Sequence, residues 1–201
     1  MPYTAEHKQT TRTRIIKSAR RLFNQRGFAD VTIDEIMSEA GLTHGGFYKH
    51  FPAKEDLYSV AVLEFIRSET PEPWQQKHID PKAEGLPLAR MILDAYLSRD
   101  HYDEREASCP MIALPSDVAR NNPVVKAAFR EVLEMMANAF APQLPPSELS
   151  SRQRALALVA LAVGGMVLAR AVDDRDLSEE IRQSARAQAF ATTAWPEGAA
   201  S

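Results

Sequence analysis

The residues with the plainest chemical meaning are the basic side chains near the N-terminus. Residues 1–29 hold seven Lys and Arg side chains against one acidic residue, Glu6, although the whole chain has a formal net charge of −3. A basic N-terminal segment on an otherwise acidic protein is typical of a protein that contacts phosphate groups through that segment only. A solvated helix face is the alternative interpretation of the same charges. The seven basic residues are Lys8, Arg12, Arg14, Lys17, Arg20, Arg21 and Arg26.

The sequence contains no motif that predicts an enzyme. It has no H-E-x-x-H, G-x-S-x-G, P-loop or G-x-G-x-x-G pattern. Its five histidines show no metal-ligand spacing with the single cysteine, Cys109. We therefore predict no catalytic residue, no metal and no cofactor. Cys109 is a candidate sensor of oxidants or electrophiles, although no Lys or Arg lies directly beside it to favour the thiolate; a buried structural cysteine is the alternative.

Residues 32–51 have the pattern of two short helices joined by a turn. Thr32 and Glu35 are spaced as a capping box, in which each side chain accepts a hydrogen bond from a free backbone N–H at the helix start. Gly41 suits the end of that helix, because glycine adopts the left-handed conformation without a steric penalty. Thr43 is the expected cap of a second, short helix. Two helices joined in this way form a helix-turn-helix, whose second helix enters the DNA major groove.

Residues on both sides of this motif extend the pattern over about the first third of the chain. They are Ile15, Ala19, Leu22 and Phe23, then Gly27, Phe28 and Thr32, then Ile36, Ala40 and Gly41, and finally Gly46 to Phe51 and Lys54 to Leu57. In this order and spacing they resemble the DNA-binding domain of TetR-family transcriptional regulators. The resemblance implies an all-α fold, with an N-terminal three-helix helix-turn-helix DNA-binding domain and a C-terminal helical domain for ligand binding and dimerisation.

The expected recognition helix is short, so few of its side chains can reach DNA. Thr43 and His44 lie at its N-terminal end, where helix-turn-helix proteins contact base edges. Gly45 allows the backbone to approach closely. The resemblance implies that Tyr48 and Lys49 contact phosphates. The full predicted DNA-binding set is Arg12, Arg14, Thr32, Thr43, His44, Gly45, Tyr48, Lys49, His50 and Lys54.

Neighbouring residues have expected roles in support of this helix. Phe47 and Phe51 should pack against the first helix, which is expected over residues 11–25, because glycines weaken the recognition helix on its own. His50 has two open interpretations, as a DNA contact or as a cap or packing residue. In TetR-like proteins the N-terminal end of the first helix can reach the phosphate backbone, which makes Arg12 and the nearby Arg14 candidates.

The remainder of the chain is predicted to be helical, because no segment shows the alternation of a strand. A Thr-Pro-Glu-Pro sequence after the expected fourth helix marks a boundary. We place the DNA-binding domain at residues 9–69, with its helix-turn-helix at 32–51, and the C-terminal regulatory and dimerisation domain at 75–195. Within the latter, the polar residues 98–108 should form a loop, and Ser178 should cap the last helix.

The segment from Ser151 to Val172 is apolar nearly all round. Such a helix must be buried on all sides, and a second subunit provides that burial in a domain this small. A core helix within one chain is the alternative. In TetR-like proteins the last two long helices pair with the same helices of a second subunit. The predicted dimer residues are Leu158, Leu161, Ala162, Gly165, Leu168, Ala169, Ala185, Gln188 and Ala189.

No segment is predicted to cross a membrane. The longest apolar run, Ala155 to Ala169, is too short for a span, and the N-terminus lacks the apolar core of a signal peptide. We therefore expect a cytoplasmic protein without a membrane partner.

The resemblance also implies a small-molecule pocket in the C-terminal domain. A ligand there favours a conformation whose recognition helices no longer fit adjacent major grooves. The alternative role for each candidate residue is plain core packing. The candidates are mainly Met and aromatic residues, which adapt to varied apolar ligands: Met91, Tyr96, Cys109, Met111, Phe129, Met135 and Met136.

These features together predict a homodimeric transcriptional regulator that binds a palindromic operator on double-stranded DNA. A two-fold dimer places two recognition helices roughly 34 Å apart, one DNA turn. The family resemblance alone favours a repressor, released by an unknown small-molecule effector, over an activator. A redox- or electrophile-responsive regulator acting through Cys109 is a further alternative. A helical small-molecule-binding protein or enzyme without DNA function is the alternative of another class.

Overall fold

The computed structural model describes residues 5–67, 80, 82–106 and 108–195. Every regular element within those ranges is a helix, which confirms the predicted all-α fold class. The predicted boundary sequence, Thr70 to Pro73, lies outside the described residues.

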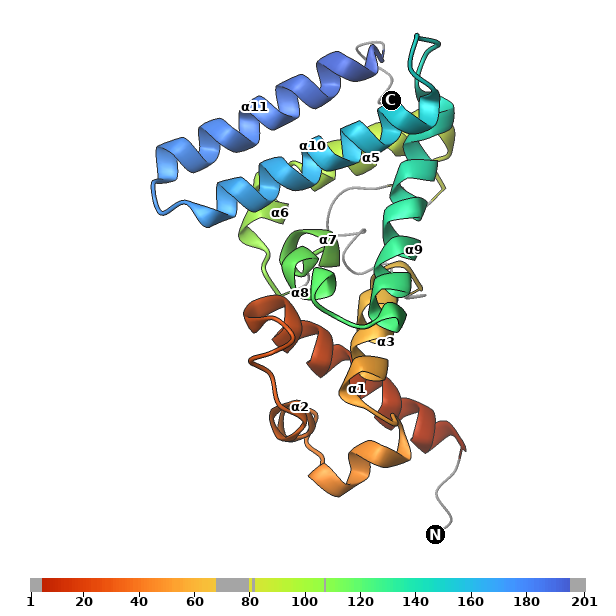
Figure 1. The fold of residues 1–201 in the computed structure, drawn as a ribbon, viewed down its shortest axis with the longest axis vertical. Helices are drawn as coiled ribbons and strands as arrows, with labels where there is room; N and C mark the ends of the chain where they lie inside the picture. Colours follow the sequence, from red (N-terminus) through yellow and green to blue (C-terminus); the bar gives the residue numbers. More distant parts are fainter. Residues whose placement is uncertain (1–4, 68–79, 81, 107, 196–201) are drawn as a thin grey trace. The chain divides into compact units, whose positions relative to one another are not determined.

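Backbone contacts divide the chain into two compact units. Unit 1 comprises Met1–Ser68 and Arg105–Val132, and unit 2 comprises Glu69–Glu104 and Leu133–Ser201. Figure 1 labels the helices. They are α1 (Ala5–Arg26), α2 (Ile33–Glu39), the 3-10 helix η1 (His44–Lys49), α3 (Lys54–Arg67), α5 (Gly85–Tyr96), α6 (Arg99–Asp103), α7 (Pro110–Ala113), α8 (Pro115–Ala119), α9 (Pro123–Phe140), the 3-10 helix η2 (Ala141–Gln143), α10 (Ser151–Ala171) and α11 (Arg175–Thr193).

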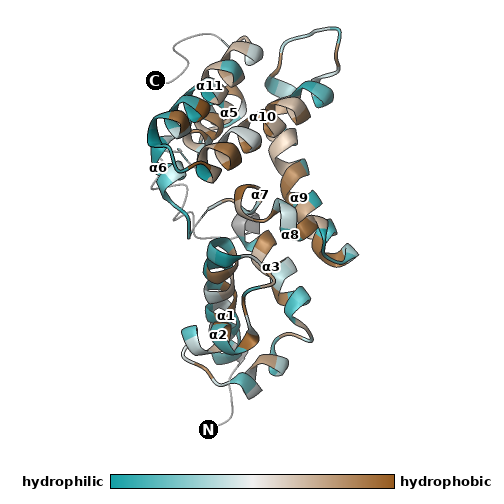
Figure 2. Ribbon diagram, turned by 60° about the vertical axis from the view of Figure 1, so that its left-hand side comes forward, coloured by the Kyte–Doolittle hydropathy of each residue, from teal (hydrophilic) through white to brown (hydrophobic). Residues whose placement is uncertain are grey.

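One face of α1 supplies the centre of unit 1. Ile15, Ala19 and Phe23 are fully buried there, at the spacing of an amphipathic helix, and Figure 2 shows hydrophobic and hydrophilic residues sharing this helix. α1 packs against α2 and α3, and Tyr58 of α3 lies edge-on to Phe23 with ring centroids 4.8 Å apart. The helix begins at Ala5, earlier than the start predicted at residue 11.

Two short helices from much later in the chain also belong to unit 1. α7 packs against α1, and Asn24 Nδ2 donates a hydrogen bond to the carbonyl of Ser108 at 3.0 Å. The backbone N–H of Phe28 donates to the carboxylate of Asp117 in α8 at 2.9 Å. Sequence reasoning places α7 and α8 in the C-terminal domain, whereas their contacts group them with the helices of the helix-turn-helix.

Unit 2 is organised around the pair α10 and α11, which lie side by side (Figure 1). The α10 bounds match the apolar helix predicted from Ser151 to Val172. Gly165 permits the close approach of the two helices, because a Cβ at this position would overlap the Cβ of Ala185. The helix that approaches α10 at this glycine is therefore α11 of the same chain.

The opposite face of α10 remains exposed and apolar. Leu168 is 59% exposed, and Ala157, Ala160 and Ala171 are exposed on the same side. Among the described residues, α10 is the one helix long and apolar enough to cross a membrane by length and composition, with 39% of its most apolar window buried. A core helix of a soluble protein passes the same test, and the contact with α11 gives α10 that role on its buried side.

The junction of α6, α10 and α11 is polar and buried. Arg182 of α11 is almost fully buried, donates to the carbonyl of Leu97 and pairs with Glu179. The hydroxyl of Ser178 donates to the carbonyl of Ala169 at 2.7 Å. Arg170 of α10 donates to three carbonyls of the α6 region, those of His101, Tyr102 and Glu104.

Two local predictions in unit 2 are wrong. Residues 98–108 do not form a plain loop, because Ser98 accepts a hydrogen bond from the backbone N–H of His101 and caps α6. Ser178 does not cap the last helix. That role belongs to Asp174, whose side chain accepts from two backbone N–H groups, so that α11 begins earlier and Ser178 lies inside it.

Candidate nucleic-acid interface

The start of α2 fixes the geometry of the helix-turn-helix. Thr32 Oγ1 accepts from the backbone N–H of Glu35, and the Glu35 carboxylate accepts from the backbone N–H of Thr32 at 2.8 Å, so the predicted capping box is present. A hydrogen bond from Arg26, together with those from Thr32, lowers the pKa of Glu35 to about 2. Gly41 adopts the left-handed conformation (φ +66°) that the predicted turn requires.

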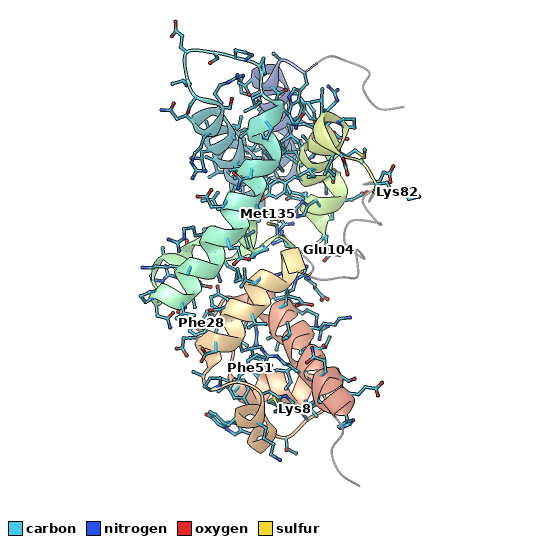
Figure 3. All side chains as sticks on the ribbon, turned by 90° about the vertical axis from the view of Figure 1, so that its right-hand side faces the viewer. Lys8, Phe28, Phe51, Lys82, Glu104 and Met135 are labelled. Carbon is cyan, nitrogen blue, oxygen red and sulfur yellow. The ribbon has the colours of Figure 1, made fainter. Side chains whose placement is uncertain are left out.

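The recognition segment is η1, a 3-10 helix of six residues. Phe47 and Phe51 are buried beneath it, as predicted, with ring centroids 5.8 Å apart. Figure 3 labels Phe51 among the side chains of unit 1. Thr43 makes no side-chain hydrogen bond to the segment, so the predicted cap is absent. Buried aromatic rings rather than a cap hold η1 in place.

The exposed side of this segment carries the predicted DNA contacts. Thr43, His44, Gly45 and Lys49 are exposed, and Tyr48 is 60% exposed. Apart from the two residues next to it in the chain, nothing lies within 4 Å of a Cβ built on Gly45. The backbone and side chains on this side of η1 are therefore accessible to a ligand as large as double-stranded DNA.

Three of the predicted DNA contacts also make hydrogen bonds within the domain. The guanidinium of Arg12 donates to the carbonyl of His50 at 2.8 Å and lies 4.1 Å from the Phe51 ring centroid. Arg14 donates to the carbonyl of Ala40. The Lys54 ammonium donates to the carbonyl of Val31 at 2.5 Å and lies 4.1 Å from the centroid of the Phe28 ring, and partial burial lowers its pKa. These cations hold the ends of short helices and turns.

Thr32 and His50 also have structural surroundings. The hydroxyl and the backbone N–H of Thr32 both form hydrogen bonds of the capping box. His50 is half-buried, and its burial, with the positive charges of Lys8, Arg12 and Lys49, lowers its pKa and favours the neutral ring. The structure thus favours the packing interpretation of His50.

Asp34 is a residue of this surface that sequence reasoning missed. Its Oδ1 lies 2.6 Å from Nδ1 of His44, and the Tyr48 ring lies edge-on to the His44 ring at 6.0 Å between centroids. The two residues of the pair are ten positions apart and on different helices, and no spacing rule connects them. The one sequence signal for a role of Asp34 was its negative charge within a motif that is expected to bind DNA phosphates.

Comparison with known proteins identifies this arrangement. The family model described as bacterial regulatory proteins, tetR family, matches residues 15–61. The N-terminal domain belongs to the TetR/AcrR family. An HTH-type transcriptional regulator of Bacillus subtilis, YerO, is 32% identical over 120 residues, which cover 59% of this chain and 40% of that protein. The HTH-type transcriptional regulator AcrR of Shigella flexneri is 33% identical over 102 residues, 51% of this chain and 47% of that protein.

The likeness to solved structures extends over nearly the whole chain. The reduced form of NemR from E. coli superposes with a TM-score of 0.72 over 94% of this chain and 99% of that one, at 18% sequence identity. This likeness concerns the fold, which matches an N-terminal helix-turn-helix domain followed by helices. The curated relatives are matched over less than half of their own length, so the sequence likeness concentrates on the DNA-binding part.

The predicted ligand-pocket residues of this TetR-family chain fall in both units. Unit 2 contains Met91, which is half-buried, the buried Tyr96 and Met136, and Met135, which is 40% exposed. Unit 1 contains the buried Cys109 and Met111 and the half-buried Phe129. Cys109 is only 1% exposed, which favours its interpretation as a structural cysteine over a sensor.

Most of the predicted dimer residues are buried within the single chain. Their burial results largely from the contact of α10 with α11. The buried ones are Leu158, Ala162, Gly165, Ala169, Ala185 and Ala189. Leu161 is half-buried, and Leu168 and Gln188 are exposed. The residues available to a second copy are therefore these three and the small residues beside them on α10.

Proposed function

We propose that this TetR-family regulator binds a palindromic operator as a homodimer and acts as a repressor. The observation that carries the proposal is the open face of η1, where Tyr48, Lys49 and His44 are exposed while Phe47 and Phe51 anchor the segment from below. Side chains on such a face can reach base edges and phosphates of one major groove. One segment of six residues offers few contacts, so a second copy is needed to specify a site.

The exposed face of α10 supports dimerisation. Ala157, Ala160, Leu161, Gly164 and Leu168 recur at helical spacing and form an apolar stripe, in which Leu161 and Gly164 are half-buried and the other three are exposed. Contiguous apolar surface of this kind marks interaction sites. Small residues let two helices approach closely, and Leu168 supplies a large side chain to bury.

Dimerisation can be tested by light scattering during size-exclusion chromatography. Leu168→Glu should yield a monomer, because two carboxylates would have to be buried at the two-fold axis. Leu149→Glu is the matched control, since Leu149 is 55% exposed but lies in the loop before α10. A monomeric wild-type protein, or a dimeric Leu168→Glu variant, would refute this interface.

The operator can be tested by selecting bound fragments from a pool of randomised DNA. The wild-type dimer should enrich two inverted half-sites about one helical turn apart. Leu168→Glu should lose the paired half-sites and bind specific DNA more weakly. Enrichment of no common sequence would refute sequence-specific recognition.

We also propose that a small apolar molecule binding in unit 2 releases the DNA. Met91, Tyr96 and Met136 support this, because they bring adaptable apolar side chains to the interior of that unit. An effector must bind the two conformations with different affinities. Compounds that raise the melting temperature should therefore also weaken operator binding, and compounds that do only the former are not effectors. The relatives are named as transcriptional regulators, which supports a cytoplasmic location.

A further inference from the structure

A hydrogen bond between His44 and Asp34 joins α2 to the recognition segment on the exposed face of the helix-turn-helix. Nδ1 of His44 lies 2.6 Å from Oδ1 of Asp34, with the two side chains 50% and 75% exposed. The His44 ring contacts this carboxylate from α2 and the edge of the Tyr48 ring from η1 itself. The pair takes no part in the hydrophobic core and none in the cap of α2, which Thr32 and Glu35 form.

The Asp34 carboxylate decides which ring nitrogen of His44 carries a proton. An ionised carboxylate can only accept hydrogen bonds, so Nδ1 must be the donor. In a neutral imidazole one nitrogen is a donor and the other an acceptor. Nε2 is then an acceptor, and it is the ring nitrogen left for a ligand.

Asp34 also fixes the direction of the ring. It lies in the first turn of α2, a helix whose start is held by a complete capping box. η1, by contrast, is a six-residue 3-10 segment with two glycines. The hydrogen bond to α2 thus removes rotamer freedom that His44 would have on η1 alone, and preorganised side chains discriminate ligands better than mobile ones.

An acidic residue here is unfavourable for DNA binding unless it has such a task. DNA is a polyanion, and Asp34 is exposed beside the residues of the open face. The positive end of the α2 dipole favours an acidic side chain, but Glu35 already supplies one in the same turn. The start of α2 therefore does not require a second carboxylate at position 34.

We propose that Asp34 is a positioning residue that determines the base preference of His44. It holds the Nδ1–H tautomer, so that Nε2 presents a hydrogen-bond acceptor to the major groove. The matching donors there are the exocyclic amino groups, N6 of adenine and N4 of cytosine. This inference rests on the proposed recognition of DNA by η1 and adds to it which chemical group His44 selects.

The tautomer can be measured without DNA. Long-range ¹H–¹⁵N spectra of the full-length protein at pH 8.0, where ordinary histidines are neutral, should show His44 protonated on Nδ1, with its signals assigned by their loss in His44→Ala. Asp34→Asn should shift the ring toward the Nε2–H form, because a carboxamide can also donate to Nδ1. Asp56→Asn is the control, since Asp56 occupies the first turn of α3. The same tautomer in wild type and Asp34→Asn would overturn the proposal.

The base preference can be measured on the selected operator with each base pair of a half-site replaced in turn. One position should favour adenine or cytosine about 3- to 10-fold, the value of one hydrogen bond. Asp34→Asn should reduce that preference below about 2-fold while leaving the other positions unchanged. His44→Ala should abolish it, and adding Asp34→Asn to His44→Ala should change nothing further, because Asp34 acts through His44.

The outcomes separate this proposal from the function on which it rests. Loss of the preference in His44→Ala with full retention in Asp34→Asn would overturn the role of Asp34. Unchanged preferences in both variants, with operator binding intact, would overturn the role of His44 and leave DNA recognition standing. If the wild type selects no sequence at all, the proposed function itself fails.

Discussion

Arginine side chains terminate helices in both units, but at different depths. In unit 1, Arg12 and Arg14 of α1 donate to the carbonyls of His50 and Ala40, the residues that follow η1 and α2. These guanidinium groups lie at the partly exposed side of the domain. Carbonyls at a helix end lack partners within the helix, and a cation from a neighbouring helix satisfies them well.

Unit 2 uses the same device in its interior. Arg182 of α11 donates to the carbonyl of Leu97, the residue after α5, and Arg170 of α10 donates to the carbonyl of Glu104, the residue after α6. Arg182 is 4% exposed. A basic residue near a DNA-binding surface is therefore not necessarily a phosphate contact, because arginine side chains also bind the carbonyls at the ends of the protein's own helices.

The burial of such an arginine should determine how much its removal lowers the free energy of unfolding. Arg182→Ala should lower the free energy of unfolding by about 3 kcal/mol, because it leaves the buried carbonyl of Leu97 unpaired and Glu179 without its partner. Arg186→Ala, which removes an exposed pair with Asp94, should cost at most about 1 kcal/mol. Urea denaturation followed by circular dichroism measures both, and equal losses would contradict the account.

The two glycines of α10 provide a second, sharper contrast within unit 2. Gly165→Ala should destabilise by about 2 kcal/mol, since its Cβ would overlap that of Ala185. In the Leu168→Glu background, which is expected to be monomeric, Gly164→Ala should stabilise by up to about 1 kcal/mol, because nothing beyond the neighbouring backbone lies within 4 Å of a Cβ built on Gly164 and alanine favours the helix. Thermal unfolding at one protein concentration compares them, since the proposed dimer makes stability depend on concentration. Destabilisation by Gly164→Ala in that monomeric background would contradict the open surroundings of Gly164 within one chain.

Removing an arginine from unit 1 should cost less stability than removing Arg182 from unit 2. Arg12→Ala should cost about 1 kcal/mol, the sum of one hydrogen bond to His50 and a partly exposed cation–π contact with Phe51. Lys49→Ala should leave stability within about 0.5 kcal/mol and weaken DNA binding instead. If Arg12→Ala kept full stability and lost only DNA affinity, the structural role would be contradicted and the phosphate role expected from the sequence would be supported.

The smallest predicted effect is on acid stability. Hydrogen bonds from Arg26 lower the pKa of Glu35 from its ordinary value near 4.5 to about 2, and those from Arg182 do the same for Glu179. A depressed folded-state pKa stabilises the protein above about pH 4.5, and that stability is lost as the pH falls toward 2. Glu35→Gln, which can keep the capping box, and Glu179→Gln should each lose less stability between pH 5 and pH 3 than the wild type. An unchanged pH dependence of the urea midpoint would contradict this.

Local patterns in the sequence predict much of unit 1. The capping box of Thr32 and Glu35, the turn at Gly41 and the burial of Phe47 and Phe51 all follow from residue types at short spacing. Each depends on contacts within a few residues, which is where propensity and capping rules apply. The long apolar helix from Ser151 was predictable for the same reason.

Contacts between distant residues could not be predicted in this way. The hydrogen bonds of Asn24 to Ser108 and of Phe28 to Asp117 join residues more than 80 positions apart. No local pattern shows that α7 packs with α1, or that Asp117 of α8 accepts a hydrogen bond from the turn after α1. The wrong prediction of Ser178 as the cap of α11 has another cause. Ser and Asp are both good caps, and tertiary packing decides that Asp174 takes this role.

The most direct test of the central claim is fluorescence anisotropy of the purified protein on DNA from its own upstream intergenic region, with excess non-specific competitor, at two salt concentrations. The account predicts binding that survives the competitor, a loss of affinity on Tyr48→Ala, and a salt slope lowered by about 1 for each phosphate contact removed by Lys49→Ala. Fragments selected from randomised DNA replace the upstream region if the operator lies elsewhere. Binding that the competitor abolishes on both kinds of DNA would show only the phosphate attraction and would contradict a sequence-specific regulator.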